Sequence, residues 1–198
     1  MVMVKICGIR DRESARACRE AGADLAGLNF VEESRRRISV EAAEDLLPEL
    51  GDVSPVGLFR GISPREVRSV VNRLGLRWVQ LHGNEQPRDF EDLAATVKIL
   101  RGVSHGAIES AQLEEWRALG AIPLIDGPDP GSGRSFDWAD IELESGFFIA
   151  GGLGPANVAS ALRATGAAGV DVASGVESDG QIDGNLIAEF VRNARGGL

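Results

Sequence analysis

The sequence predicts a compact (β/α)8 barrel with short loops, formed by residues 1–198 as a single domain. Eight short apolar segments recur along the chain, and stretches with helical start and stop signals lie between them. They are spaced by roughly 25 residues, enough for one strand and one short helix each. Uninterrupted apolar runs are typical of parallel strands that are buried on both faces. The alternative is an open doubly wound sheet, but no G-x-G-x-x-G motif follows the first strand, so a dinucleotide-binding fold has little support.

Helix-capping residues separate the predicted strands in the first half of the chain. Asp11 is placed to cap a helix that Gly22 ends, and Ser39 is placed to cap the next one. Ser63 and Glu66 form a capping box around a proline at the first helical position, which is a strong start signal. The elements predicted here are strands over residues 4–7, 25–30, 55–59 and 78–81, and helices over residues 12–21, 39–47, 63–74 and 87–95.

The second half of the chain continues this alternation. A stretch rich in glycine, proline and serine, residues 127–135, follows Asp126 and lengthens one loop. The elements predicted here are strands over residues 97–100, 122–125, 147–150 and 169–172, and helices over residues 109–119, 137–141, from 155 onward and 183–195.

Composition excludes several classes of function. The formal net charge of −9 disfavours nucleic acids and anionic membranes, because both require a basic surface. Cys7 and Cys18 are the only cysteines and lack C-x-x-C spacing, so neither a disulfide framework nor a structural zinc site is expected. The sequence shows no targeting segment and no apolar run of membrane-spanning length. We therefore expect a soluble cytoplasmic protein.

Chemically useful side chains stand at several predicted strand ends, which meet at one rim of a barrel. They are Cys7, His82, Asp126 and Ser174. Because side chains alternate along a strand, Lys5 shares a face with Cys7, and a lysine beneath the thiol would favour the thiolate. Their positions at different strand ends suggest that Cys7 is a base and Asp126 an acid. Judged by itself, Asp126 is equally well explained as a helix cap. His82 is either a structural hydrogen-bond partner or a substrate contact.

Two glycine-containing turns predict a phosphate site. Gly151-Gly152 and Ser174-Gly175 follow the seventh and eighth strands, where barrels of this kind hold phosphate against backbone N–H groups and a helix N-terminus. Asp171 lies inside the eighth strand, where a carboxylate is costly unless it pairs with another side chain or a substrate hydroxyl. The cluster over residues 35–37 supplies arginines for an anionic substrate, although three arginines are also typical of a solvated loop.

Taken together, segments along the whole chain resemble the phosphoribosylanthranilate isomerase family. The segments that carry the resemblance, in chain order, are Val4-Lys5-Ile6-Cys7-Gly8, Ser34-Arg35-Arg36, Val56-Gly57-Leu58-Phe59, Val79-Gln80-Leu81-His82-Gly83, Gly131-Ser132-Gly133 with Phe136-Asp137-Trp138, Ala150-Gly151-Gly152-Leu153 with Pro155 and Asn157-Val158, and Gly169-Val170-Asp171-Val172 with Ser174-Gly175-Val176-Glu177. That family is a (β/α)8 barrel of tryptophan biosynthesis that works without metal or organic cofactor.

The resemblance implies an Amadori rearrangement of N-(5-phosphoribosyl)anthranilate, a small phosphorylated substrate. We expect the protein to be a monomer or homodimer. It implies that Asp126 is the general acid that opens the furanose ring and that Cys7 is the general base that removes the proton from C2. It also implies that Arg36 lies near the anthranilate carboxylate and that Gly152, Ser174 and Gly175 form the phosphate pocket. We expect His82, Gly151 and Asp171 to contact the substrate as well.

The chain departs from the family pattern near several strand ends. The departures are Asn29, Arg60-Gly61, Gly127, Gly154 and Ala173, and none removes a catalytic group. A barrel that binds a phosphorylated metabolite without turning it over is therefore one alternative. A second alternative is the histidine-pathway isomerase, which acts on a related aminoaldose. That family resembles a barrel with aspartates at both catalytic strand ends, so the cysteine at position 7 argues against it. A metal-dependent sugar-phosphate epimerase has little support, because His82 and His105 are the only histidines.

Overall fold

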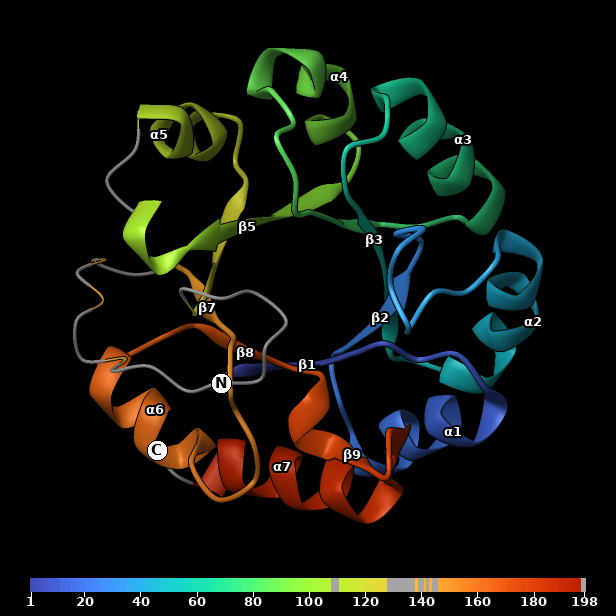
Figure 1. Cartoon of the computed structure of the whole chain (residues 1–198), viewed down its shortest axis with the longest axis vertical. Helices are drawn as coiled ribbons and strands as arrows, with labels where there is room; N and C mark the ends of the chain where they lie inside the picture. The colour runs from blue at the N-terminus through green and yellow to red at the C-terminus, as the bar shows by residue number, and fades with distance from the viewer. Residues whose placement is uncertain (108–110, 128–137, 139–140, 142, 144–145, 197–198) are drawn as a thin grey trace.

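The computed structural model describes residues 1–107, 111–127, 138, 141, 143 and 146–196. Eight parallel strands follow one another in chain order around a closed barrel, which confirms the predicted fold class, and helices surround this barrel (Figure 1). The strands are β1 Met3–Cys7, β2 Leu25–Asn29, β3 Ser54–Phe59, β4 Trp78–Leu81, β5 Lys98–Ser104, β6 Ile122–Asp126, β7 Phe148–Ile149 and β8 Gly169–Val172.

Local capping signals act in the structure as the sequence predicts. The Asp11 side chain accepts a hydrogen bond from the Ser14 N–H, and Ser63 and Glu66 form the reciprocal capping box. The α-helices are α1 Arg12–Ala21, α2 Val40–Leu50, α3 Pro64–Leu74, α4 Glu91–Ala94, α5 Ala111–Ala118, α6 Val158–Thr165 and α7 Gly184–Gly196. Among the described residues, no helix is both long enough and apolar enough to cross a membrane.

Tertiary packing moves several predicted boundaries. Helix α2 continues past Pro48 to Leu50, because Leu46 and Leu50 are buried and the proline falls in the last turn. The helix predicted over residues 87–95 is a 3-10 turn, Pro87–Asp89, followed by the short α4. A two-stranded sheet of β9 (Glu177–Ser178) and β10 (Gln181–Ile182) was not predicted. The short helix predicted over residues 137–141 lies largely outside the described residues.

Strand β5 is longer than the sequence predicts. It extends beyond residue 100 to Ser104, because each added residue pairs with β6, up to Ser104 opposite Asp126. The sequence prediction ends this strand at Leu100, before Arg101 and Gly102. Arg101 is nevertheless buried, and a carboxylate from the next loop compensates its charge.

The interior of the barrel is apolar at one end and polar at the other. A cluster of buried apolar side chains fills the part of the interior away from the carboxyl ends of the strands: Leu25, Val56, Trp78, Leu100, Leu124, Phe148 and Ala150. A second, larger cluster lies between the sheet and the helices and forms the main core. Strand pairing places Lys5 beside Asp171 and Cys7 beside Gly27, on the interior face near the carboxyl ends of their strands. The candidate site is therefore at the carboxyl end of the barrel, where such barrels place their chemistry.

Candidate active site

A buried ion pair lies beneath the polar end of the barrel. The Lys5 ammonium lies 2.8 Å from an Asp171 carboxylate oxygen, and Lys5 is fully buried. The Asp171 carboxylate therefore has another side chain as its partner, one of the two roles left open by the sequence. Burial lowers the pKa of Lys5, but the charge of Asp171 and the interaction with Cys7 raise it by more, so its pKa is above the ordinary value. Lys5 is thus a permanent cation inside the barrel.

The Cys7 thiol lies beside this cation, as predicted. A Cβ atom added at Gly27 would lie 3.0 Å from the Cys7 Sγ and 3.1 Å from the Lys5 Nζ, so both side chains end at the same point of the barrel wall. The Lys5 charge lowers the pKa of Cys7, as predicted. Burial raises the pKa of Cys7, and this effect exceeds the lowering by Lys5, so the pKa is above the ordinary value. The resting group is the thiol, and Lys5 limits the cost of forming the thiolate.

Asp126 ends β6 with a carboxyl group that can hold a proton near neutral pH. The group is buried, and this burial raises its pKa to about 6. The Gly127 N–H donates a 2.8 Å hydrogen bond to one Asp126 oxygen, which opposes the rise, and the Asp171 charge adds to it. These properties fit a general acid better than a simple helix cap.

His82 lies close to Asp126 without forming an ion pair with it. Its Nε2 is 4.0 Å from an Asp126 oxygen, and burial together with the Arg101 charge lowers the pKa of His82 to about 4. The imidazole is therefore neutral at physiological pH. Its Nδ1 lies 3.4 Å from the Gln80 amide nitrogen. A neutral ring at this place can exchange hydrogen bonds with a substrate but adds no charge.

A cavity of about 70 Å³ brings several of the predicted site residues together. It is lined by Arg36, Asp126, Ala150, Gly151, Gly152, Leu153, Asp171, Val172, Ala173 and Ser174. Gly151 has φ +81°, and a Cβ atom there would lie 2.7 Å from an Asp126 oxygen, so glycine is required for both reasons. Gly175 does not line this cavity, but a Cβ on it would overlap the Leu153 carbonyl oxygen, so it lets the two turns approach each other.

Cys7 and His82 lie outside the lining of this cavity. His82 instead lines a neighbouring cavity of about 380 Å³ at the ends of β4 and β5, together with Arg60, Arg101 and Trp116. Cys7 nevertheless interacts with a residue of the first cavity. The charge of Asp171, which lines that cavity, raises the pKa of Cys7 as well as that of Asp126. The candidate site thus comprises two separate cavities, one small and one larger, at the carboxyl end of the barrel.

Arg36 contributes a guanidinium group with a free edge. Its Nε donates a 2.5 Å hydrogen bond to Glu177, while its Nη2 is buried and has no partner among the described residues. The side chain lies against Gly8, where a Cβ would be 2.5 Å from the Arg36 Cδ. An unpartnered N–H donor beside a cavity is suited to bind an anion.

Sequence reasoning missed the ion pair between Glu85 and Arg101. The distance between its nearest atoms is 2.6 Å, and both residues are buried. Glu85 also accepts hydrogen bonds from the Gly61 and Gly83 backbone N–H groups, so it ties the loops after β3 and β4 to β5. The only available signal was an arginine directly after the predicted fifth strand, which by itself does not identify its partner.

Among the described residues, no group of three or more His, Cys, Asp or Glu side chains is arranged to hold a metal ion.

The Lys5–Asp171 pair gives a stability prediction. Changing Lys5 to Met is expected to lower the free energy of unfolding by about 3 to 5 kcal/mol, because Asp171 is left buried without its cation. The double variant Lys5→Met with Asp171→Leu should recover most of this loss. Urea unfolding of the three proteins tests this, and a single variant as stable as the wild type would contradict it.

Comparison with known proteins agrees with this geometry. Residues 4–193 match the family model described as N-(5'-phosphoribosyl)anthranilate (PRA) isomerase. A relative from Streptococcus pneumoniae (strain Taiwan19F-14), named N-(5'-phosphoribosyl)anthranilate isomerase, is 36% identical over 203 residues, which cover 100% of this chain and 98% of the relative.

Solved structures give the same result. Monomers of the dimeric phosphoribosylanthranilate isomerase from Thermotoga maritima are 32% identical, with a TM-score of 0.84 and coverage of 99% of this chain and 100% of theirs. A phosphoribosylanthranilate isomerase in complex with reduced 1-(o-carboxyphenylamino)-1-deoxyribulose 5-phosphate is 34% identical, with a TM-score of 0.80 and the same coverage. The chain therefore belongs to the N-(5'-phosphoribosyl)anthranilate isomerase family.

Proposed function

We propose that this chain catalyses the Amadori rearrangement of N-(5-phosphoribosyl)anthranilate to 1-(2-carboxyphenylamino)-1-deoxyribulose 5-phosphate, a step of tryptophan biosynthesis. Family membership supports the reaction. The observation that carries the assignment of residues is the Asp126 carboxyl with a pKa of about 6, on the same barrel rim as the Cys7 thiol beside a buried lysine. Ring opening needs an acid, and the second step needs a base.

In the first step, Asp126 gives its proton to the furanose ring oxygen. The bond between that oxygen and C1 breaks, and the lone pair of the anthranilate nitrogen forms the C1=N double bond of a Schiff base. The raised pKa of Asp126 favours this step, because a larger fraction of the carboxyl is protonated near neutral pH than for an ordinary aspartate.

In the second step, the Cys7 thiolate removes the proton from C2. The electrons of the C2–H bond form a C1=C2 double bond, and the C=N electrons return to nitrogen, which gives an enolamine. Uptake of a proton at C1 and loss of the C2 hydroxyl proton then give the ketone. The Lys5 ammonium supports the transient thiolate, because its charge lowers the pKa of Cys7 against the effect of burial.

The remaining site residues hold the substrate in this proposal. The turns at Gly151-Gly152 and Ser174-Gly175 bind the phosphate through backbone N–H groups, and the free edge of Arg36 binds the anthranilate carboxylate. His82, as a neutral ring next to Asp126, contacts the sugar. Asp171 acts mainly through Lys5, and it faces the same cavity as the phosphate turns.

The test is a fluorescence assay of N-(5-phosphoribosyl)anthranilate consumption by the purified protein, with a chelator present and no added metal. Consumption with formation of the ketose product supports the proposal. Binding of the reduced product without any turnover would favour the alternative of a non-catalytic binding barrel. Assaying the histidine-pathway aminoaldose in parallel separates the second alternative, which predicts turnover of that compound instead.

We further propose that residues 1–198 act as one catalytic domain, as a monomer or homodimer in the cytoplasm. The relative from Thermotoga maritima is a dimeric enzyme whose structure was solved as monomers, and this supports both oligomeric states. Size-exclusion chromatography with light scattering distinguishes them.

A further inference from the structure

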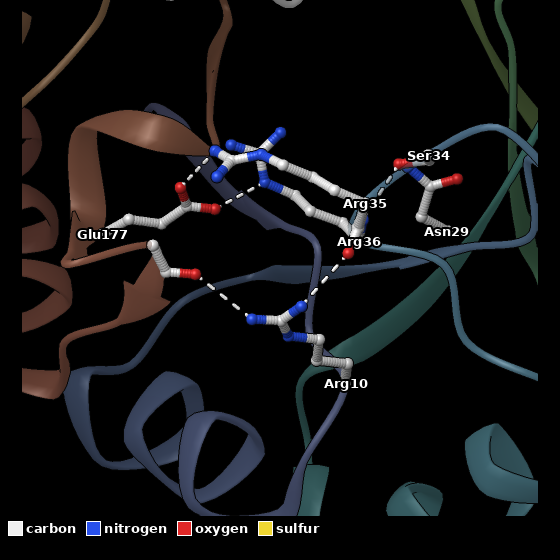
Figure 2. Close-up of polar contacts among 7 residues, drawn as sticks. Arg10, Asn29, Ser34, Arg35, Arg36 and Glu177 are labelled. Carbon is white, nitrogen blue, oxygen red and sulfur yellow. Dashed lines mark hydrogen bonds and ion pairs between the residues drawn. The ribbon is translucent and has the colours of Figure 1, made fainter.

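Glu177 lies at the centre of a network that joins two loops of the candidate site (Figure 2). It begins β9, just after the turn at Ser174-Gly175. One carboxylate oxygen accepts a 2.5 Å hydrogen bond from the Arg36 Nε, and the other accepts one of the same length from an Arg35 Nη2. The loop that follows β2 is thereby connected to the loop that follows β8.

The Glu177 carboxylate is held as an anion. Its side chain is only 8% exposed, and burial by itself raises its pKa. The hydrogen bond and the charge of Arg36, followed by those of Arg35, lower the pKa by more, so it is below the ordinary value. The carboxylate is therefore ionised throughout the neutral pH range. Together with the two arginines that it contacts, Glu177 forms a group of three side chains with a net charge of +1.

The contact with Glu177 uses only one edge of the Arg36 guanidinium. A guanidinium group carries five N–H donors in a rigid plane, so fixing the Nε edge also fixes the direction of the Nη groups. The Arg36 Nη2 is buried and has no partner among the described residues, and Arg36 lines the cavity that also contains Asp126. Glu177 thus fixes the arginine and leaves an N–H donor available.

The backbone of Arg36 is held independently of Glu177. Its N–H donates to the Ser34 Oγ at 3.1 Å, and Ser34 in turn accepts a 2.9 Å hydrogen bond from the Asn29 side chain (Figure 2). Arg10 donates to the carbonyl oxygens of Arg35 and Gly180 at 3.1 Å and 3.2 Å. Removing the Glu177 charge should therefore leave the loop in place and affect mainly the orientation of the guanidinium.

We propose that Glu177 is a positioning residue that orients Arg36 toward the carboxylate of the bound substrate. This inference rests on the proposed function, in which Arg36 binds the anthranilate carboxylate. Glu177 itself touches no reacting atom. It turns a flexible side chain into a preorganised anion-binding group, which reduces the conformational entropy lost when the substrate binds.

The test compares Glu177→Gln with Glu49→Gln as a matched control. Glu49 in α2 also bridges two arginines, Arg12 and Arg16 of α1, and this contact between helices is away from the site. For Glu177→Gln we expect the KM to rise about tenfold, the size of one weakened charge-assisted hydrogen bond. The kcat should stay within about threefold of the wild type, because the acid and the base are unchanged. Glu49→Gln should change neither constant.

A second arm shows whether Glu177 acts through Arg36. In an Arg36→Ala background, Glu177→Gln should have no further effect on KM, because the group that it orients is absent. A persistent effect in that background, or an unchanged KM in the single variant, would overturn the proposal. If Glu177→Gln is poorly folded, Glu177→Asp serves in the same cycle, with the same expected loss of effect when Arg36 is absent. Absence of wild-type turnover would instead contradict the proposed function, so the two failures are distinguishable.

Discussion

Replacing Cys7 with serine is expected to lower kcat by about 100- to 10,000-fold, the range contributed by one general base. A hydroxyl of the same shape is a much weaker acid than a thiol, so the fraction that is deprotonated becomes negligible even beside Lys5. Affinity for the reduced product should survive, because the phosphate turns and Arg36 are unchanged. Steady-state kinetics and product titration measure the two effects separately.

Cys18→Ser is the matched control for this variant. Cys18 is a buried thiol in α1, remote from the barrel interior, so its replacement should leave kcat unchanged even where it reduces stability. Near-full activity of Cys7→Ser would show that the assigned base is wrong. Since the base takes only a proton, no covalent intermediate on Cys7 should be trapped, and mass spectrometry during turnover tests this.

Replacing Asp126 with asparagine is expected to lower kcat by a similar factor, about 100- to 10,000-fold, because the ring oxygen loses its proton donor. The amide preserves the shape of the side chain and can still accept the hydrogen bond from the Gly127 N–H. The exposed Asp45→Asn is the control and should be fully active. An active Asp126→Asn would leave the carboxyl with only the role of a helix cap.

The pH dependence gives an independent test of the acid and the base. Activity requires a protonated Asp126 together with a Cys7 thiolate. Below pH about 6, Asp126 stays protonated while the thiolate fraction increases tenfold per pH unit, so kcat/KM should rise. Above this pH the two fractions change in opposite directions and kcat/KM should be constant until the raised pKa of Cys7 is reached. In Asp126→Asn the break near pH 6 should vanish, and the residual activity should keep rising with pH.

The raised pKa of Asp126 also has a stability consequence. The folded protein binds this proton more tightly than the unfolded chain, since the pKa is about 6 instead of 3.8. The resulting stabilisation is complete below pH 3.8 and is lost as the pH rises through about 6. Asp126→Asn should therefore be more stable than the wild type at pH 8, by about 1 to 3 kcal/mol, and this difference should shrink toward pH 4. Urea unfolding at both pH values measures it.

Local signals in the sequence predicted most of the barrel. Caps such as Asp11 and Ser63 act on backbone groups within three residues, so they are readable without a fold. Period-two alternation likewise placed Lys5 and Cys7 on one face. Strand ends were less reliable: β5 continues through Arg101 because β6 pairs with it and Glu85 neutralises its charge.

By itself, the sequence determined the alternation of strands and helices, the residues at the carboxyl ends of the strands, and the family to which the chain belongs. These depend on local periodicity, on short motifs and on their order along the chain. Only the tertiary structure decided the protonation and orientation of the site. Burial raises the pKa of Cys7 despite Lys5, raises that of Asp126 to about 6, and makes His82 neutral. It also brings Glu177 against Arg36, 141 residues earlier in the chain. Desolvation and long-range pairing depend on the whole packed barrel, and no local pattern encodes them.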